Sequence, residues 1–514
     1  MNWSNRIASQ QEIRMPDNQE GKESSYDEIR RRSAQSVVWS FFSNILTKII
    51  TPLYTIILAR LLSPEDYGII AIAALVIALL NILQTMGLGQ ALVQRNERVE
   101  KAANVVFWFN LLLSITLYIG LYFASPFVSV FFKEPRAMAV IRVMGIQLVI
   151  GAFGIVQEAL LRHQLNFKKL FWFQLLPSVI PGIVCILLAL IGWGYWSLVY
   201  GTLIGTVIGV IILWFQSAWR PSFHIDAGLA KQLTIFGTMV MIETSASWIY
   251  DYFDNMVVGH YLGIQELGIY SLGYRIVMMV IMFFVLPVTN VAYSSFSRMQ
   301  NDLTQLQSLF QRVTRLIAMV LIPVCLGLAT VSDSVETVLF GEKWEGLGMI
   351  LLAISIMPGL SFLWFLVPQV FRAIGRPDIN AKMGIGFLLY VIPLFLLTAP
   401  HGLQVFLIAR MSVGFVTMPI IIYLTVRYLK VPYNFLWTCS REPFTASCIM
   451  MAVVYASTEI LKLSFGCISL PGLVFVIVIG ALTYTIASLK INRDDTLFVI
   501  GKIKSQMVLR RAGV

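Results

Sequence analysis

Charged side chains interrupt the long apolar stretches of this chain, where they could bind ions or anionic groups. Glu243, Asp251 and Asp254, together with Ser247, fall within an arc of about 80° when successive residues are placed 100° apart on a helix. An ionised group inside a bilayer is costly, so it usually faces a cavity or a charged partner. Three carboxylates on one face therefore predict a site for a coupling cation, either a proton or sodium.

A second polar group centres on Lys48. Eight side chains share an arc of about 140° on one expected helix: Ser40, Ser43, Asn44, Thr47, Lys48, Thr51, Tyr54 and Thr55. A helix–helix seam of small hydroxyl side chains would explain most of this stripe, but it does not require a lysine at its centre. We therefore expect Lys48, with Asn44 and Thr51, to contact an anionic substrate.

Arg275 is another cation expected inside the membrane. It lies about eight residues below the outer end of its helix, and Asp254 lies about seven below the outer end of the preceding antiparallel helix, so both should sit at similar depth. A purely structural Asp254–Arg275 pair is one interpretation. The other is that Arg275 binds substrate. Arg142 and Arg410 are expected near helix ends or along one helix face, where long side chains reach the interface.

The composition is that of an integral membrane protein. Of 514 residues, 58% are hydrophobic and 13% are charged, whereas soluble proteins carry about 25% charged residues. The net charge of +11 does not predict nucleic-acid binding, because Lys and Arg lie in short stretches between apolar segments. The chain has no phosphate-binding GxxxxGK(S/T), no HExxH and no CxxC motif, which argues against an ATP-driven pump, a metalloenzyme or a bound cofactor.

Apolar runs long enough to cross about 30 Å of hydrocarbon predict about fourteen transmembrane helices in an all-α protein. The expected spans are 37–61, 67–86, 103–124, 137–161, 170–191, 196–215, 233–261, 267–286, 316–331, 346–371, 383–397, 405–426, 444–463 and 468–489. They group into a tail (1–35), a six-helix bundle (36–217), a linker (218–232), a second six-helix bundle (233–428), two additional helices (443–489) and a second tail (490–514).

Basic residues distinguish the two sides of the membrane. The loops near 95–101, 162–169, 220–231, 298–315, 372–382 and 427–441 are basic. The alternate loops are short and acidic, with Glu65, Asp66, Glu266 and Glu342 among their residues. Because basic loops stay in the cytoplasm, this pattern predicts that both tails are cytoplasmic.

The two bundles carry an internal repeat. Residues 60–69 (RLLSPEDYGI) recur as residues 260–269 (HYLGIQELGI), so that Gly68 corresponds to Gly268. Further on, FKE at 132–134 resembles FGE at 340–342, and Arg162 at the end of the fourth expected helix corresponds to Arg372 at the end of the tenth. Because six is an even number, both halves enter the membrane in the same sense, as parallel repeats around a central cavity.

Several segments together resemble the polysaccharide-transport family of bacterial capsule and exopolysaccharide flippases. The segments are ILARLLSPEDYG at 57–68, GLGQALVQR at 87–95, LLR at 160–162, NFK at 166–168, GWGYWSLV at 192–199, WRP at 219–221, DNMVVG at 254–259, LGIYS at 267–271 and SFSRMQ at 295–300. The chain departs from this pattern at His260, where family members often carry Arg.

This family belongs to the multidrug, oligosaccharidyl-lipid and polysaccharide exporter superfamily. The resemblance implies ion-coupled alternating access, in which an undecaprenyl-pyrophosphate-linked oligosaccharide moves from the inner to the outer leaflet of the bacterial cytoplasmic membrane. It places Lys48, Asp251, Asp254 and Arg275 on helices that line the cavity. Membrane lipids and a polysaccharide polymerase with its chain-length machinery are the partners it suggests.

Three alternatives remain open at this point. A drug or organic-cation antiporter of the same superfamily would have an acidic, aromatic cavity, which Lys48 does not favour. A membrane polysaccharide polymerase or ligase would need a substantial outward loop with catalytic groups, and the longest expected loops, near 125–136 and 332–345, are short. A scaffold would not need charges in the bilayer.

Overall fold

The computed structural model describes residues 46–48, 50–85, 89, 92, 99–163, 167–223, 248, 249 and 251–491. Asn44 and Glu243, with Ser40, Ser43 and Ser247, lie outside the described residues. Within the described part, every regular element is helical, as the apolar runs predict. Eleven of these helices are long and apolar enough to cross a bilayer, and a bent pair makes a twelfth span. The first and seventh expected spans are described only in part, so the number fourteen stays a prediction.

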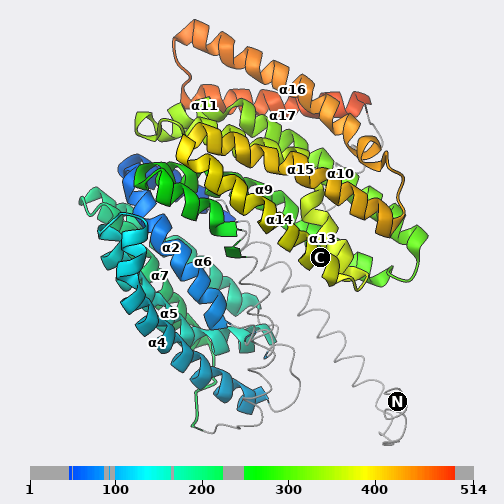
Figure 1. The fold of residues 1–514 in the computed structure, drawn as a ribbon. Coiled ribbons are helices and arrows are strands. Elements are labelled where there is room, and N and C mark those ends of the chain that lie inside the picture. The colour runs from blue at the N-terminus through cyan, green and yellow to red at the C-terminus, as the bar shows by residue number, and fades with distance from the viewer. Residues whose placement is uncertain are drawn as a thin grey trace, which may run out of the picture.

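The helices form two halves and an added pair (Figure 1). The first half contains residues 50–61, α2 (Pro64–Thr85), α4 (Val99–Phe131), α5 (Arg136–His163), α6 (Phe167–Leu190) and α7 (Tyr195–Gln216). The second half contains residues 251–261, α9 (Ile264–Arg298), α10 (Leu303–Thr330), the bent pair α12 (Leu347–Leu360) and α13 (Leu363–Ala373), α14 (Pro377–Thr398) and α15 (Leu403–Leu429). The added helices α16 (Phe435–Phe465) and α17 (Leu470–Ile491) pack on α10 of the second half.

One expected span is broken. The sequence predicts a continuous helix over 346–371, but α12 and α13 meet at an angle of 43° around Ser361 and Phe362. Pro358 lies in the last turn of α12 and cannot donate to the carbonyl oxygen of Ile354, which weakens the end of this helix next to the bend. Broken helices are tolerated at membrane depth where they line a cavity.

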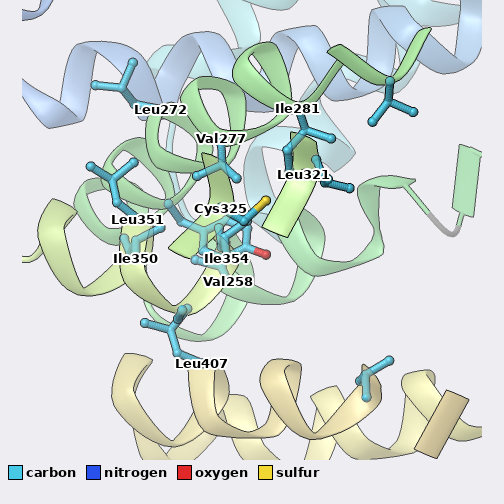
Figure 2. Packing of buried hydrophobic residues seen from close by; sticks show 14 of the residues in the cluster. Val258, Leu272, Val277, Ile281, Leu321, Cys325, Ile350, Leu351, Ile354 and Leu407 are labelled. Carbon is cyan, nitrogen blue, oxygen red and sulfur yellow. The ribbon is translucent and has the colours of Figure 1, made fainter. Parts of the chain in front are cut away.

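Apolar side chains fill the interior of the second half. Figure 2 shows Val258, Cys325 and Ile354 among the buried residues of one cluster, and they come from the segment 251–261, α10 and α12. All three are buried. In a bilayer such packing stabilises the bundle through close van der Waals contact rather than through removal of apolar surface from water. The outside of the molecule is correspondingly apolar, with Phe127 and Phe215 of the first half and Leu463 of the added pair exposed.

The halves meet where α2 crosses α9, through the two glycines of the internal repeat. A methyl group on Gly68 would overlap the carbonyl oxygen of Ile264, and one on Gly268 would overlap the carbonyl oxygen of Pro64. These contacts are reciprocal, because Pro64 corresponds to Ile264 as Gly68 does to Gly268. A self-complementary contact of this kind is expected around a two-fold axis. The repeat thus gives the two backbones room to touch at the crossing.

Candidate functional site

A cavity of about 580 Å³ lies between the two halves. One wall is the face of α2 that carries Tyr67, Ile70, Ala71 and Ala74. The other wall comes from the segment 251–261 and from α9, with the lining residues Asp251, Tyr252, Asn255, Ser271, Leu272, Tyr274, Arg275, Met278, Met279 and Met282. A cavity at the boundary between parallel repeats is where transporters of this architecture bind substrate.

Asp251 and Arg275 are the two charged side chains among the residues that line this cavity. Arg275 is exposed to the cavity, and no ion pair or hydrogen bond engages its guanidinium among the described residues. The Asp251 carboxylate likewise has no hydrogen bond or ion pair within the described part of the chain. The structure therefore brings together two of the residues that the sequence singled out and leaves both open to a ligand.

The expected Asp254–Arg275 pair is wrong. Asp254 is 1% exposed, and its Oδ2 lies 3.2 Å from Nη2 of Arg410 on α15. The same oxygen accepts a hydrogen bond from the Tyr270 hydroxyl at 2.7 Å, while Oδ1 accepts from the backbone and side-chain amides of Asn255 at 2.7 and 3.0 Å. This carboxylate is saturated by protein groups. The depth argument that suggested Arg275 applies equally to Arg410, which lies seven residues into α15, and could have identified it.

A second compartment of about 360 Å³ opens beside the central cavity, inside the second half. Its walls include Pro358 and Ser361 at the break between α12 and α13, and Arg410 on α15. Asp251 and Tyr274 line both spaces. Asp251 therefore lies at the junction of the two compartments.

Lys48 does not reach the central cavity. It lies in a neighbouring crevice of about 240 Å³ between the first helix, α9 and the segment 335–340, with Nζ 5.2 Å from the centre of the Phe283 ring. Except for Lys48 and Thr55, the residues that line this crevice are apolar, and Met279 also lines the central cavity. Lys48 and Asp251 thus line different spaces.

Thr51, the other described residue of the predicted substrate site, lines neither space. Its carbonyl oxygen accepts a hydrogen bond from the Thr55 hydroxyl at 2.8 Å. Tyr54 on the same helix packs against Gly182 of α6. The polar stripe of the first helix is therefore divided among several contacts, because neighbouring helices surround it. The prediction that Lys48, Asn44 and Thr51 together contact an anionic substrate therefore stays a prediction.

The arrangement suits a ligand with separate anionic, polar and apolar parts. An unpaired guanidinium is a strong donor to phosphate oxygens, Asp251 is an acceptor for a cation, and the tyrosines offer flat surfaces for sugars. The described residues contain no group of three or more His, Cys, Asp or Glu side chains able to hold a metal ion.

Comparisons with known proteins agree on one family. The family model described as "Polysaccharide biosynthesis protein" matches residues 57–348, more than half of the chain. The teichuronic acid biosynthesis protein TuaB of Bacillus subtilis is 28% identical over 318 residues, which cover 61% of this chain and 66% of that protein. The succinoglycan biosynthesis transport protein ExoT of Rhizobium meliloti is 27% identical, with 63% and 66% covered. The matches thus span just under two thirds of these relatives' length.

Two solved structures share the fold. The lipid II flippase MurJ in an inward closed conformation aligns with a TM-score of 0.69 and 18% identity over 90% of this chain and 99% of that one. An inward-facing multidrug resistance MATE family transporter aligns with a TM-score of 0.59 and 16% identity over 75% and 98%. With its apolar helices and the match over 57–348, the chain is a multi-pass membrane protein that belongs to the polysaccharide biosynthesis protein family.

Proposed function

We propose that this protein is a flippase that moves an undecaprenyl-pyrophosphate-linked oligosaccharide from the inner to the outer leaflet of the membrane. The observation that carries the proposal is Arg275, which has no ion pair among the described residues and lines a cavity between the two halves of a fold shared with a lipid flippase. A relative named as a succinoglycan transport protein supports transport rather than catalysis. The substrate class is the one that the family resemblance implies, and the cavity is compatible with it, because it offers a cation for phosphate and polar and aromatic groups for sugar.

In this proposal Arg275 holds the pyrophosphate, because a fixed cation in a poorly solvated cavity attracts a multiply charged anion strongly. The crevice that contains Lys48 suits the part of the substrate where the pyrophosphate joins the lipid chain. Its walls are apolar apart from Lys48 and Thr55, and it adjoins the central cavity at Met279. Lys48 would contact the phosphate nearest the lipid, while the polyprenyl chain stays among the apolar side chains.

Asp251 is the residue we assign to the coupling ion, a proton or sodium. Its carboxylate faces two compartments and has no hydrogen bond or ion pair among the described residues, whereas Asp254 is saturated. A coupling acid must bind and release its cation in turn, and an acid held by four protein groups is poorly suited to that cycle. Asp254 is better placed to anchor α15 to the segment 251–261.

The expected location is the bacterial cytoplasmic membrane, with both termini in the cytoplasm, because the basic loops favour that orientation. A polysaccharide polymerase with its chain-length machinery would take the product on the outer side. Undecaprenyl-pyrophosphate oligosaccharide would then reach the active site of the polymerase only after this protein has moved it.

Cells that lack the protein provide the test. Mass spectrometry of lipid extracts should find a lipid-linked oligosaccharide that accumulates on the cytoplasmic side, and restoring the gene should remove it. A drug antiporter would instead leave lipid-linked sugars unchanged and would transport ethidium in vesicles. Such a result would favour a drug antiporter over a flippase.

A further inference from the structure

Among the hydrogen bonds that join the two halves, those of Arg60 and His260 lie at the end of the molecule where the first helix of each half connects to the second. Arg60 of the first half donates to the carbonyl oxygens of Val338 and Leu339 in the second half, with Nε 2.8 Å from the Leu339 oxygen. His260 of the second half bonds through Nδ1 to the carbonyl oxygen of Phe131 in the first half at 2.8 Å. A carbonyl oxygen only accepts, so this ring nitrogen carries the proton.

These two contacts are counterparts in the internal repeat. Arg60 and His260 hold the same position in residues 60–69 and 260–269. Phe131 and Leu339 each precede the matching segments 132–134 and 340–342. Phe131 is the last residue of α4, and Leu339 lies in the short helical turn Glu336–Phe340 that follows α10. Carbonyl groups at such helix ends lack helical partners and carry partial negative charge. Each half thus places a donor on the exposed helix end of the other.

The contacts surround a tightly closed region directly beside the central cavity. Trp344 of the second half is fully buried, and its Nε1 donates to the Ala59 carbonyl oxygen of the first half at 2.7 Å. Its ring packs edge-on against Tyr67 with centroids 5.2 Å apart, and Tyr67 also lines the cavity. Gly68 directly follows Tyr67 in α2, and at its crossing with Gly268 of α9 the two backbones touch.

We propose that Arg60 and His260 are paired gating residues, which hold the central cavity closed at this end and must release when it opens there. The proposal rests on the transport function proposed above. The donors are not equivalent, because Arg60 reaches two carbonyl groups and His260 reaches one. The His260 contact is the weaker of the two and opens first.

The physical reason for this design is reversibility. Hydrogen bonds to helix-end carbonyls can be exchanged for hydrogen bonds to water, so each contact contributes only modestly to the closed state. Two modest contacts on opposite sides of an approximate two-fold axis keep the halves aligned without locking them. A large apolar seal in their place would hold the closed state too firmly for a cycle.

The test measures access to the cavity rather than transport. Ser271, which lines the cavity, is replaced by Cys, and its reaction with a membrane-impermeant thiol reagent is quantified by mass spectrometry of the peptide that contains it. The reagent is applied to intact cells and, separately, to inside-out vesicles. Arg60→Met and His260→Phe remove the hydrogen bonds but keep apolar bulk, and Phe retains the stacking of ring 260 on Phe131.

We expect the double variant Arg60→Met/His260→Phe to react about tenfold faster or more from the outer side, with a smaller increase for His260→Phe than for Arg60→Met. Arg136→Ala and His401→Ala are matched controls. Arg136 bonds only Glu134 and Glu65 of its own half among the described residues, and His401 lies between α14 and α15. Both controls should leave the rate unchanged.

Unchanged rates from both sides in a folded double variant would overturn the gate. An increase seen only in inside-out vesicles would overturn the assignment of this gate to the outer side. If the double variant fails to fold, Gly268→Ala gives a second route, because its methyl group must push Pro64 away and raise the same rate. If the gate behaves as expected but the protein moves no lipid-linked oligosaccharide, the proposed function is contradicted and the gate is not.

Discussion

Asp254 and Arg410 form a buried ion pair between the segment 251–261 and α15, with 3.2 Å between Oδ2 and Nη2. The guanidinium also lies against the rings of Tyr274 and Phe395, 5.6 and 5.9 Å from their centres. Because Asp254 pairs with Arg410, Arg275 lines the central cavity without an ion pair among the described residues and can contact a ligand there. One structural pair thus determines which other charges are open to ligands.

The first prediction concerns the stability of this pair. Asp254→Asn should lower the free energy of unfolding by on the order of 2 kcal/mol, because the buried Asp254 loses its charge-assisted contacts with Arg410 and Tyr270. Asp251→Asn, one turn earlier on the same helix, is the matched control and should change stability little. Thermal unfolding of purified protein in detergent measures both. Equal melting temperatures for the two variants would argue against the structural role.

Part of this site could be predicted from sequence and part could not. Spacing along one helix placed Asp251 on the same face as Asp254, and the depth argument placed Arg275 inside the membrane but beside the wrong carboxylate, Asp254. Predicting the partner of Asp254 requires knowing which helix lies next to that residue in space, and α15 follows Asp254 by about 150 residues in the sequence. The same limit applies to Lys48, since the stripe on its helix indicates polarity but not which neighbouring helix covers each part.

The fold shows a similar division. Apolar runs predicted the helices because their length reflects bilayer thickness. They did not predict the bend at Ser361, since hydropathy averages over a window and is insensitive to one missing amide hydrogen at Pro358. The repeat of Gly68 and Gly268 was visible in the sequence. Their mutual contact was not, because similarity between two segments does not indicate that they touch.

The second prediction concerns ion coupling at Asp251. Asp251→Asn should abolish transport driven by an ion gradient while the protein folds and inserts normally, because the amide cannot take up and release a cation. Transport of lipid-linked oligosaccharide in vesicles with an imposed proton or sodium gradient measures this. Asp251→Glu, which keeps the charge, serves as the control. Full gradient-driven transport by the Asn variant would remove the coupling role from this residue.

The third prediction concerns orientation. Arg376→Cys should react with an impermeant thiol reagent only from the cytoplasmic side, and Glu342→Cys only from outside, because the basic loops are expected inside. The residues lie at opposite ends of the bent pair α12 and α13. Labelling in intact cells and in inside-out vesicles separates the two sides. Reaction of Arg376→Cys in intact cells would reverse the topology.

The fourth prediction is a pH dependence at the loop between α4 and α5. Hydrogen bonds from Arg136, with Nε 2.7 Å from Oε1, hold the pKa of Glu134 below its ordinary value. A lowered folded-state pKa means that this pair stabilises the protein above the unfolded-state pKa of about 4.3, and that the contribution is lost as pH falls through the folded-state value. Arg136 is half exposed, so the effect should be about 1 kcal/mol or less. Melting temperatures measured from pH 6 to pH 3 should fall more for the unmodified protein than for Glu134→Gln, and parallel curves would contradict this assignment.

The last prediction separates the roles of Arg275 and Lys48. If Arg275 holds the pyrophosphate, Arg275→Ala should weaken binding of both free pyrophosphate and a pyrophosphate-lipid analogue by about tenfold or more, since a charge-assisted contact is lost. Arg275→Lys should keep part of the affinity, because it keeps the charge but not the planar fork. Stability should change little, as no ion pair of Arg275 is broken within the described residues.

Lys48→Ala should behave differently, because its crevice is apolar and lies beside the cavity rather than in it. We expect it to weaken binding of the lipid analogue while leaving that of free pyrophosphate unchanged. Arg142→Ala is the matched control, since that arginine also lies within a membrane helix but bonds Ser125 and stacks on Tyr122. Calorimetric titration of the purified protein measures all four variants. If Arg275→Ala binds both ligands with unchanged affinity, Arg275 is not part of the phosphate site. If Lys48→Ala loses the same affinity for both ligands, Lys48 contacts the pyrophosphate head group and not its junction with the lipid.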